Sequence, residues 1–130
     1  MSTLKVTNIQ ATGETASRAV SGVAAAWVCL NQQSTQSIRD SVNIASISDT
    51  GTGRTDISFT SNLSNSDYCA SGSAENGGGY NDARMTNREN GQPRSASTFG
   101  MYTVNGGSST VNPYSDDANH VNISFHGDLA

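Results

Sequence analysis

Few residues in this chain have the type and spacing that catalysis requires, and the clearest motif lies at Asp49–Thr52. Asp-Thr-Gly is the signature of aspartic proteases, in which two aspartates from two halves or two subunits share one proton. No apolar flap follows the motif in this sequence. The same residues make an ordinary hairpin loop, because Gly51 and Gly53 can adopt positive φ. We therefore favour a turn over a protease site.

The two histidines are the next candidates, as metal ligands. His120 and His126 lie on one face of a predicted strand but six residues apart. At ~3.4 Å per residue they are about 20 Å apart, too far to share a metal ion within one chain. Copies of one histidine could meet on the axis of a threefold assembly, but two exposed strand residues are the favoured interpretation. We expect no metal site.

Cys29 and Cys69 both fall in predicted strands and could pair across the fold. In a protein made in a reducing cytosol, free buried thiols are favoured over a disulfide. The glycine run at 77–79 is not a phosphate-binding loop, because no Lys-Ser/Thr pair follows it. We expect no cofactor and no enzymatic activity.

Aromatic residues could instead form a binding surface. Trp27, the only tryptophan, could stack against a sugar, but its place in the middle of an apolar strand favours a core position. Tyr80, Tyr102 and Tyr114 are better candidates for an exposed aromatic surface, although such a surface is not the favoured interpretation for them either.

Composition limits the class of protein. The 130 residues fit one domain, and a net charge of −4 argues against a nucleic-acid-binding protein. Leu, Ile, Val and Phe together number only 21, so the core must be thin. Thin cores are stabilised by disulfides, metals or oligomerisation, and oligomerisation is the best remaining choice here. The longest run without a strongly polar residue, Gly22–Leu30, is too short to span a membrane.

The stretch from Ala26 to Phe59 organises the predicted fold. Ala24–Leu30 predicts a strand with Trp27 and Cys29 on one face and three apolar residues on the other. Val42–Ile47 predicts a second strand, in which a bulge near Ala45 and Ser46 would restore the inward direction of its last residue. After the glycine turn, Thr55–Phe59 alternates as an inward and outward strand.

Further strands follow in the second half. The predicted segments are Tyr68–Ala70, Ala96–Val104, Thr110–Tyr114 and His120–His126, separated by an irregular loop at Ser71–Ser95. About seven strands at this spacing indicate an all-β sandwich or barrel. Residues 1–25 are predicted to be an arm outside it, with an extended or strand segment at Ser2–Gln10 and a short helix or coil at Thr12–Gly22.

The central motifs resemble a recurrent module of bacteriophage tail-fibre and virion surface proteins. That module has a Trp-Val strand, an Ile-Arg-x-Ser-x-Asn-Val-x-Ser-Ile-x-Asp strand, a Gly-Thr-Gly turn, a Phe-Thr strand end and a Tyr-Ala strand. The matching residues here are Ala26-Trp27-Val28, Ile38–Asp49, Gly51-Thr52-Gly53, Ile57–Thr60 and Tyr68.

The two ends of the chain extend the resemblance. His120–Asp128 resembles the closing strand of that family, and Leu4–Gln10 resembles its lead-in. Departures are Leu30, where an aromatic residue is common, and Cys29 and Cys69, at positions that are not usually cysteine. The match is specific over residues 26–70 and weak over 71–119.

The resemblance implies a single antiparallel β-sandwich, jelly-roll-like, over residues 26–130, assembled as a homotrimer without enzymatic activity. Its partners would be itself, the major capsid protein and, as a further contact, host surface polysaccharide. The protein would be made in the host cytoplasm and would lie on the outer surface of the virion head or in a tail fibre.

A chain with only about 25 residues before the sandwich favours a capsid decoration or cement protein over a tail-fibre tip or receptor-binding adhesin. A carbohydrate-binding module is a more remote alternative. As a decoration protein it would dock through the arm, with Leu4, Lys5, Val6, Ile9 and Arg18 as the contact residues. The outer surface that contacts the host would include Tyr80, Arg84, Arg88 and Arg94.

Overall fold

The computed structural model of this chain describes residues 8–9, 18–19, 23–75, 84–87, 93–105, 114–115 and 117–130. The regular structure in these ranges is all β-strand, as predicted. The strands are β1 (Asn8–Ile9), β2 (Arg18–Ala19), β3 (Ala24–Asn31), β4 (Ser37–Val42), β5 (Ile44–Gly51), β6 (Arg54–Phe59), β7 (Cys69–Glu75), β8 (Arg84–Asn87), β9 (Thr98–Asn105), β10 (Tyr114–Ser115) and β11 (His120–His126).

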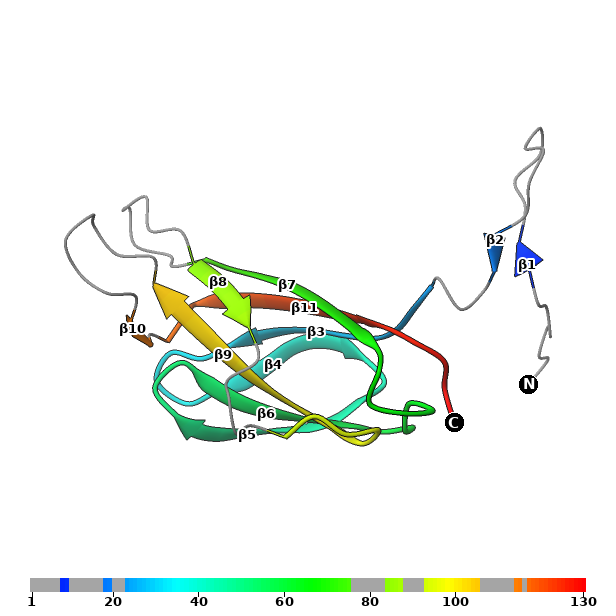
Figure 1. Cartoon of the computed structure of the whole chain (residues 1–130). Coiled ribbons are helices and arrows are strands. Elements are labelled where there is room, and N and C mark those ends of the chain that lie inside the picture. The colour runs from blue at the N-terminus through cyan, green and yellow to red at the C-terminus, as the bar shows by residue number, and fades with distance from the viewer. Residues whose placement is uncertain are drawn as a thin grey trace.

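The strands form two antiparallel sheets. β1 and β2 pair with each other, and the other nine form one sheet in the order β4-β3-β11-β7-β8-β9-β6-β5, with β10 added on β9. This long sheet curls so that β3, β11 and β7 lie over β5 and β6, as Figure 1 shows. The result is a β-sandwich-like fold with its core between the two layers.

The core takes one face of β3, β6, β9 and β11, as the alternation in the sequence predicts. Ile57 and Phe59 of β6 and Phe99 and Met101 of β9 are buried, and so are Ala26, Val28 and Leu30 of β3. In β11 the predicted inward residues Val121, Ile123 and Phe125 are all buried. The alternation of β3, β6, β9 and β11 is therefore confirmed.

Four aromatic rings fill the centre of the core. The ring of Phe125 lies 5.0 Å from that of Phe59 and 5.2 Å from that of Phe99, both at steep edge-to-face angles. Tyr68 joins the cluster, 5.9 Å from Phe59 and from Phe125. Edge-to-face contacts add to the stabilisation from burial, so this cluster compensates for the small number of aliphatic residues.

The two edge strands of the sheet are consecutive in the chain, and Asn43 turns the chain from one to the other. Asn43 has a φ of 59°, a left-handed conformation that asparagine tolerates better than most residues. Its amide nitrogen donates to the carbonyls of Ala25 and Ser61, at 3.2 and 3.0 Å, and its Oδ1 accepts from the Ser61 amide at 2.7 Å. Asn43 thus ties the start of β3 to the end of β6.

The single strand predicted over Val42–Ile47 is therefore wrong at Asn43, because that residue leaves the β conformation. The bulge predicted near Ala45 and Ser46 is confirmed. Ile44 pairs with Phe59 and Ser46 with Ser58, so Ala45 has no partner in the register. The glycine turn is confirmed as well, with φ of 135° at Gly51 and 69° at Gly53.

The predicted irregular loop over Ser71–Ser95 is wrong in two places. β7 continues through Glu75, and Arg84–Asn87 forms β8, which pairs with β9. The residues at 71–73, Ser-Gly-Ser, have low strand propensity. β7 forms nevertheless because it pairs along its whole length with β11. The helical alternative at Thr12–Gly22 is also wrong for Arg18 and Ala19, which pair with β1, and its other residues lie outside the described ranges.

Candidate functional site

The outer face of the layer formed by β3, β11 and β7 carries the most distinctive surface in the described structure. The register aligns Trp27 of β3 with Ser124 of β11, and Ser124 with Ser71 of β7. The next outward row is Cys29, Asn122 and Ser73. One large aromatic side chain therefore lies beside a group of small polar side chains.

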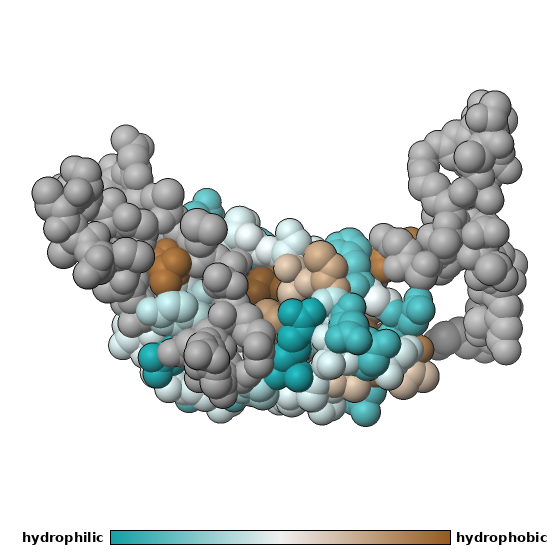
Figure 2. Space-filling view, viewed as in Figure 1, coloured by the Kyte–Doolittle hydropathy of each residue, from teal (hydrophilic) through white to brown (hydrophobic). Residues whose placement is uncertain are grey.

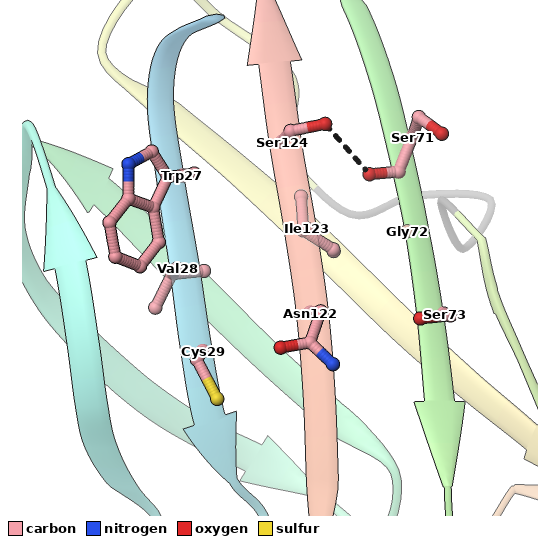
Figure 3. A pocket seen from close by; sticks show the side chains of 9 residues that line it. All are labelled: Trp27, Val28, Cys29, Ser71, Gly72, Ser73, Asn122, Ile123 and Ser124. Atoms are coloured by element: carbon pink, nitrogen blue, oxygen red, sulfur yellow. Dashed lines mark hydrogen bonds between the residues drawn. The ribbon is translucent and has the colours of Figure 1, made fainter.

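This difference in size produces a trough of about 410 Å³ that is open to solvent. The nine residues that line it are Trp27, Val28, Cys29, Ser71, Gly72, Ser73, Asn122, Ile123 and Ser124, shown in Figure 3. The indole stands on β3 at one side, and the serines of β7 stand at the other. The trough is thus walled by an aromatic ring and floored by hydroxyl and amide groups.

Polar groups in the trough are partly engaged within the fold. The Ser124 hydroxyl donates to the Ser71 carbonyl at 3.5 Å, drawn in Figure 3, and lies 3.2 Å from His126 Nε2. Ser71, Ser73 and Asn122 are exposed. None of the nine lining residues has a formal charge at neutral pH, so the trough suits binding of a neutral, amphipathic group better than acid–base chemistry.

The position of Trp27 corrects the expectation that it belongs to the core. It lies at intermediate exposure on the outward face, while Ala26, Val28 and Leu30 on the opposite face are buried. Both faces of this strand are apolar, but the protein has one core and only one face can enter it. The sequence contained a signal for an outward tryptophan. In an alternating strand Trp27 shares one face with Cys29, and the aliphatic residues occupy the opposite face.

The candidate catalytic motif is a turn. The Asp49 carboxylate accepts a hydrogen bond from the Gly51 amide at 2.9 Å, as an aspartate in a tight turn does. In the part of the chain that the structure describes, no group of three or more His, Cys, Asp or Glu residues is placed to hold a metal ion. His120 and His126 occupy opposite ends of β11, and His120 Nδ1 lies 3.3 Å from a Glu75 oxygen.

The two cysteines are free thiols, but the expectation that they are buried is wrong. Cys69 is exposed and Cys29 is of intermediate exposure. Cys29 pairs with Asn122 and Cys69 with His126, on opposite sides of β11 and four residues apart along it. That offset alone is about 13 Å at ~3.3 Å per residue. A disulfide needs Cα atoms within about 7 Å, so these two cannot bridge in this fold.

Asp56 is the one described residue with a clear pKa shift. Desolvation by burial raises the pKa of its carboxyl above the ordinary value of 3.8. It lies on β6 between Ser48 of β5 and Gly100 of β9, and its Oδ1 is buried with no hydrogen-bond partner. Among the residues that the structure describes, no acid or base partner accompanies Asp56, so this shift bears on stability.

The residues predicted for capsid docking fall mostly outside the described ranges. Leu4, Lys5 and Val6 lie outside them, and so do Tyr80 and Arg88 among the predicted host-contact residues. Ile9 and Arg18 are register partners in the β1–β2 pair. Arg84 begins β8. The docking and host-contact assignments of these residues stay predictions.

Arg94 has a definite place within the domain. Its Nε donates to the Ser66 carbonyl at 2.8 Å, a terminal nitrogen donates to the Tyr68 carbonyl, and its guanidinium lies 4.7 Å from the centre of the Tyr68 ring. These contacts hold the segment before β7 against the segment before β9. Tyr102, another tyrosine considered for an aromatic surface, is of intermediate exposure and lies under the Arg54 guanidinium at 5.9 Å.

Apolar side chains are exposed at one end of the β3 layer. Val23, which precedes β3, is 52% exposed, Val42 at the end of β4 is 48% exposed, and Leu129 beyond β11 is 52% exposed. Antiparallel pairing brings the start of β3 and the ends of β4 and β11 to the same end of the layer. On the face in Figure 2, the coloured residues show hydrophobic areas as separate spots between hydrophilic ones. We call Val23, Val42 and Leu129 the apolar end.

No protein-family model, no curated protein and no solved structure matches this chain. The described residues include no helix with the length and apolar character needed to cross a membrane.

Proposed function

We propose that this chain is a non-enzymatic structural protein of a bacteriophage particle, a homotrimeric capsid decoration or cement protein with a jelly-roll-like sandwich. The proposal rests on the resemblance of its central motifs to phage virion surface modules. The observation that supports it most is the apolar end. A domain with a thin core exposes Val23, Val42 and Leu129 at one end of the β3 layer, as expected if neighbouring subunits cover them.

The trimer contact would use this end of the domain and the adjoining edge strand. β4 is an edge of the sheet, and Ile38 on it is 37% exposed. Exposed edge strands with apolar side chains are sites of association unless something covers them. Residues 1–25 join the domain at this same end, since β3 begins at Ala24, so three arms would leave a trimer together.

The mechanism would be clamping of capsid subunits. Each arm, with Leu4, Lys5, Val6, Ile9 and Arg18 as contact residues, would bind the major capsid protein. Once one arm of the trimer is bound, the other two arms are held at a high effective concentration near their own sites. Three weak contacts therefore combine into firm binding. Tyr80, Arg84, Arg88 and Arg94 would lie on the outer surface, where host polysaccharide is a further partner.

Deletion of residues 2–20 tests the docking arm. The truncated protein should remain a trimer and should no longer sediment with capsids that lack the protein. The docking assignment is wrong if the truncated trimer sediments as well as the full chain does.

The trimer contact is tested by Val42→Asp, with Ser46→Asp as the matched control on the exposed face of β5. A charge at the apolar end should dissociate the trimer, and the same charge at Ser46 should leave it intact. Equal masses for both variants and the full chain would contradict the assigned contact.

A tail-fibre tip or receptor-binding adhesin is the alternative, and copy number separates the two. A decoration protein should be present in hundreds of copies per particle and a fibre in tens at most. Densitometry of purified particles against the major capsid protein measures the ratio.

A further inference from the structure

We infer that the trough beside Trp27 is a binding site for a neutral glycan, with the indole as its stacking platform. This inference rests on the proposed contact with host polysaccharide and adds a second site for it, on the outer face of β3, β11 and β7 and separate from the arginines proposed above. It does not require the capsid placement, because a glycan site can serve a decoration protein or a fibre tip equally.

The chemistry of the lining carries the inference. A sugar ring has a face of C–H groups and a rim of hydroxyls. An aromatic ring that is partly exposed to water can stack on the face of C–H groups. Short hydroxyl and amide side chains can hydrogen-bond to the rim of hydroxyls. Trp27 supplies the ring, and Ser71, Ser73 and Asn122 supply exposed donors and acceptors across the trough. An apolar wall with a few convergent polar groups is the usual composition of small-ligand sites.

The size of the site fits the same ligand class. Its volume of about 410 Å³ lies in the range of ~300–1,000 Å³ typical of such sites. The trough is open to solvent, so a chain of sugars could enter from the side and continue past it. The small side chains of β7 and β11 keep it open, since a larger residue at Ser73 would fill it.

The charge pattern argues against two competing ligands. Nucleobases also stack on aromatic rings, but nucleic acid brings phosphates that need Lys or Arg. None of the lining residues is basic, and the chain has a net charge of −4. The same absence of cations disfavours acidic polysaccharide. A neutral glycan is the ligand that this lining suits.

The trough is compatible with the proposed trimer contact. Val42 pairs with Trp27 on the β4 side, whereas the polar floor lies on the β11 and β7 side. A subunit packed on Val42 would support the indole from behind and leave the trough open.

Fluorescence gives a direct test, because Trp27 is the only tryptophan in the chain. The full-length protein is first screened on an array of neutral gluco-, manno- and galacto-oligosaccharides. Each oligosaccharide that binds is then titrated while tryptophan emission and acrylamide quenching are recorded. Binding should change the emission and protect Trp27 from acrylamide.

Two variants test the site. Trp27→Ala should weaken binding roughly tenfold or more, while Trp27→Phe should retain part of it. Ser73→Arg, at an exposed position, should block the trough without affecting the fold, and Ser46→Arg on β5 is the matched control that should bind normally. Circular dichroism of each variant shows whether it is folded.

The inference is overturned if no neutral oligosaccharide binds, if binding leaves the emission and quenching of Trp27 unchanged, or if folded Ser73→Arg binds as well as Ser46→Arg. Trp27 that is inaccessible to acrylamide in the free oligomer would also overturn it, because a subunit would then cover the trough. Glycan binding is measured on purified protein, so its failure is distinct from a failure to bind capsids.

Discussion

Asn43 gives the sharpest test of what holds the two layers of this fold together. It joins the two edge strands, β4 and β5, and its side chain connects the start of β3 to the end of β6. Asn43→Ala removes three hydrogen bonds, to the Ala25 carbonyl, to the Ser61 carbonyl and from the Ser61 amide. It also places alanine at a φ of 59°. Both losses act on the folded state, so the variant should unfold at a lower denaturant concentration.

The magnitude follows from the two terms. A left-handed conformation costs a non-glycine residue roughly 1–2 kcal/mol, although asparagine tolerates it better than alanine. Each hydrogen bond contributes about 1 kcal/mol net, and less where water can replace it, as it can at this partly exposed corner. The expected loss of unfolding free energy is about 2–4 kcal/mol, a large part of the stability of a domain this size.

Asn43→Gly separates the two terms. Glycine adopts the left-handed conformation without strain, so this variant loses the hydrogen bonds alone and some entropy in the unfolded state. Urea unfolding followed by circular dichroism should rank the proteins as wild type, then glycine, then alanine. A loss below about 0.5 kcal/mol for alanine, or a glycine variant less stable than alanine, would refute the reasoning.

Three further predictions follow from the described contacts. Phe125→Ala opens the aromatic cluster of the core and should cost about 3–5 kcal/mol, measured by the same urea unfolding; a loss near 1 kcal/mol would mean that the cluster is not central to packing. Asp56→Asn should be slightly more stable than wild type at pH 7, by up to about 0.5 kcal/mol. The raised pKa of Asp56 means that its ionised form destabilises the fold above that pKa. The cost disappears as the pH falls below the unfolded value of 3.8, so a constant difference in melting temperature down to pH 3 would contradict this. Mild oxidation of the native protein should leave Cys29 and Cys69 unlinked within a chain, and a non-reducing gel with peptide mapping would reveal an intramolecular bridge if the register were wrong.

The strands that sequence predicted well are those with one clearly apolar face. Thr55–Phe59 and His120–His126 alternate without interruption, and burial of one face fixes their register. The bulge at Ala45 was predictable because two apolar residues of one strand had opposite parity. In these segments local pattern and tertiary packing indicate the same structure.

The remaining differences have a common cause, which is that pairing outweighs local preference. The Ser-Gly-Ser segment of β7 has low strand propensity and is extended because β11 lies beside it. The turn at Asn43 depends on partners at Ala25 and Ser61, 18 residues away on either side. The outward position of Trp27 depends on which of two apolar faces the other layer covers. A local sequence pattern does not specify any of these contacts between residues far apart in the chain.

The candidate site was therefore only partly predictable. The sequence marks Trp27, the aromatic wall of the site, as a candidate sugar platform, but the apolar strand around it favours a core position. Its floor comes from β7 and β11, which lie about 50 residues apart in sequence and meet only through the sheet order. The thin core, by contrast, was readable from composition, and it leads to the central claim that this chain works as an oligomer.

Light scattering of the purified full-length protein tests that claim most directly. A homotrimer predicts a solution mass three times the chain mass of 13.5 kDa, independent of concentration in the micromolar range. A mass equal to one chain would contradict the trimer and with it the assignment of the apolar end as a subunit contact.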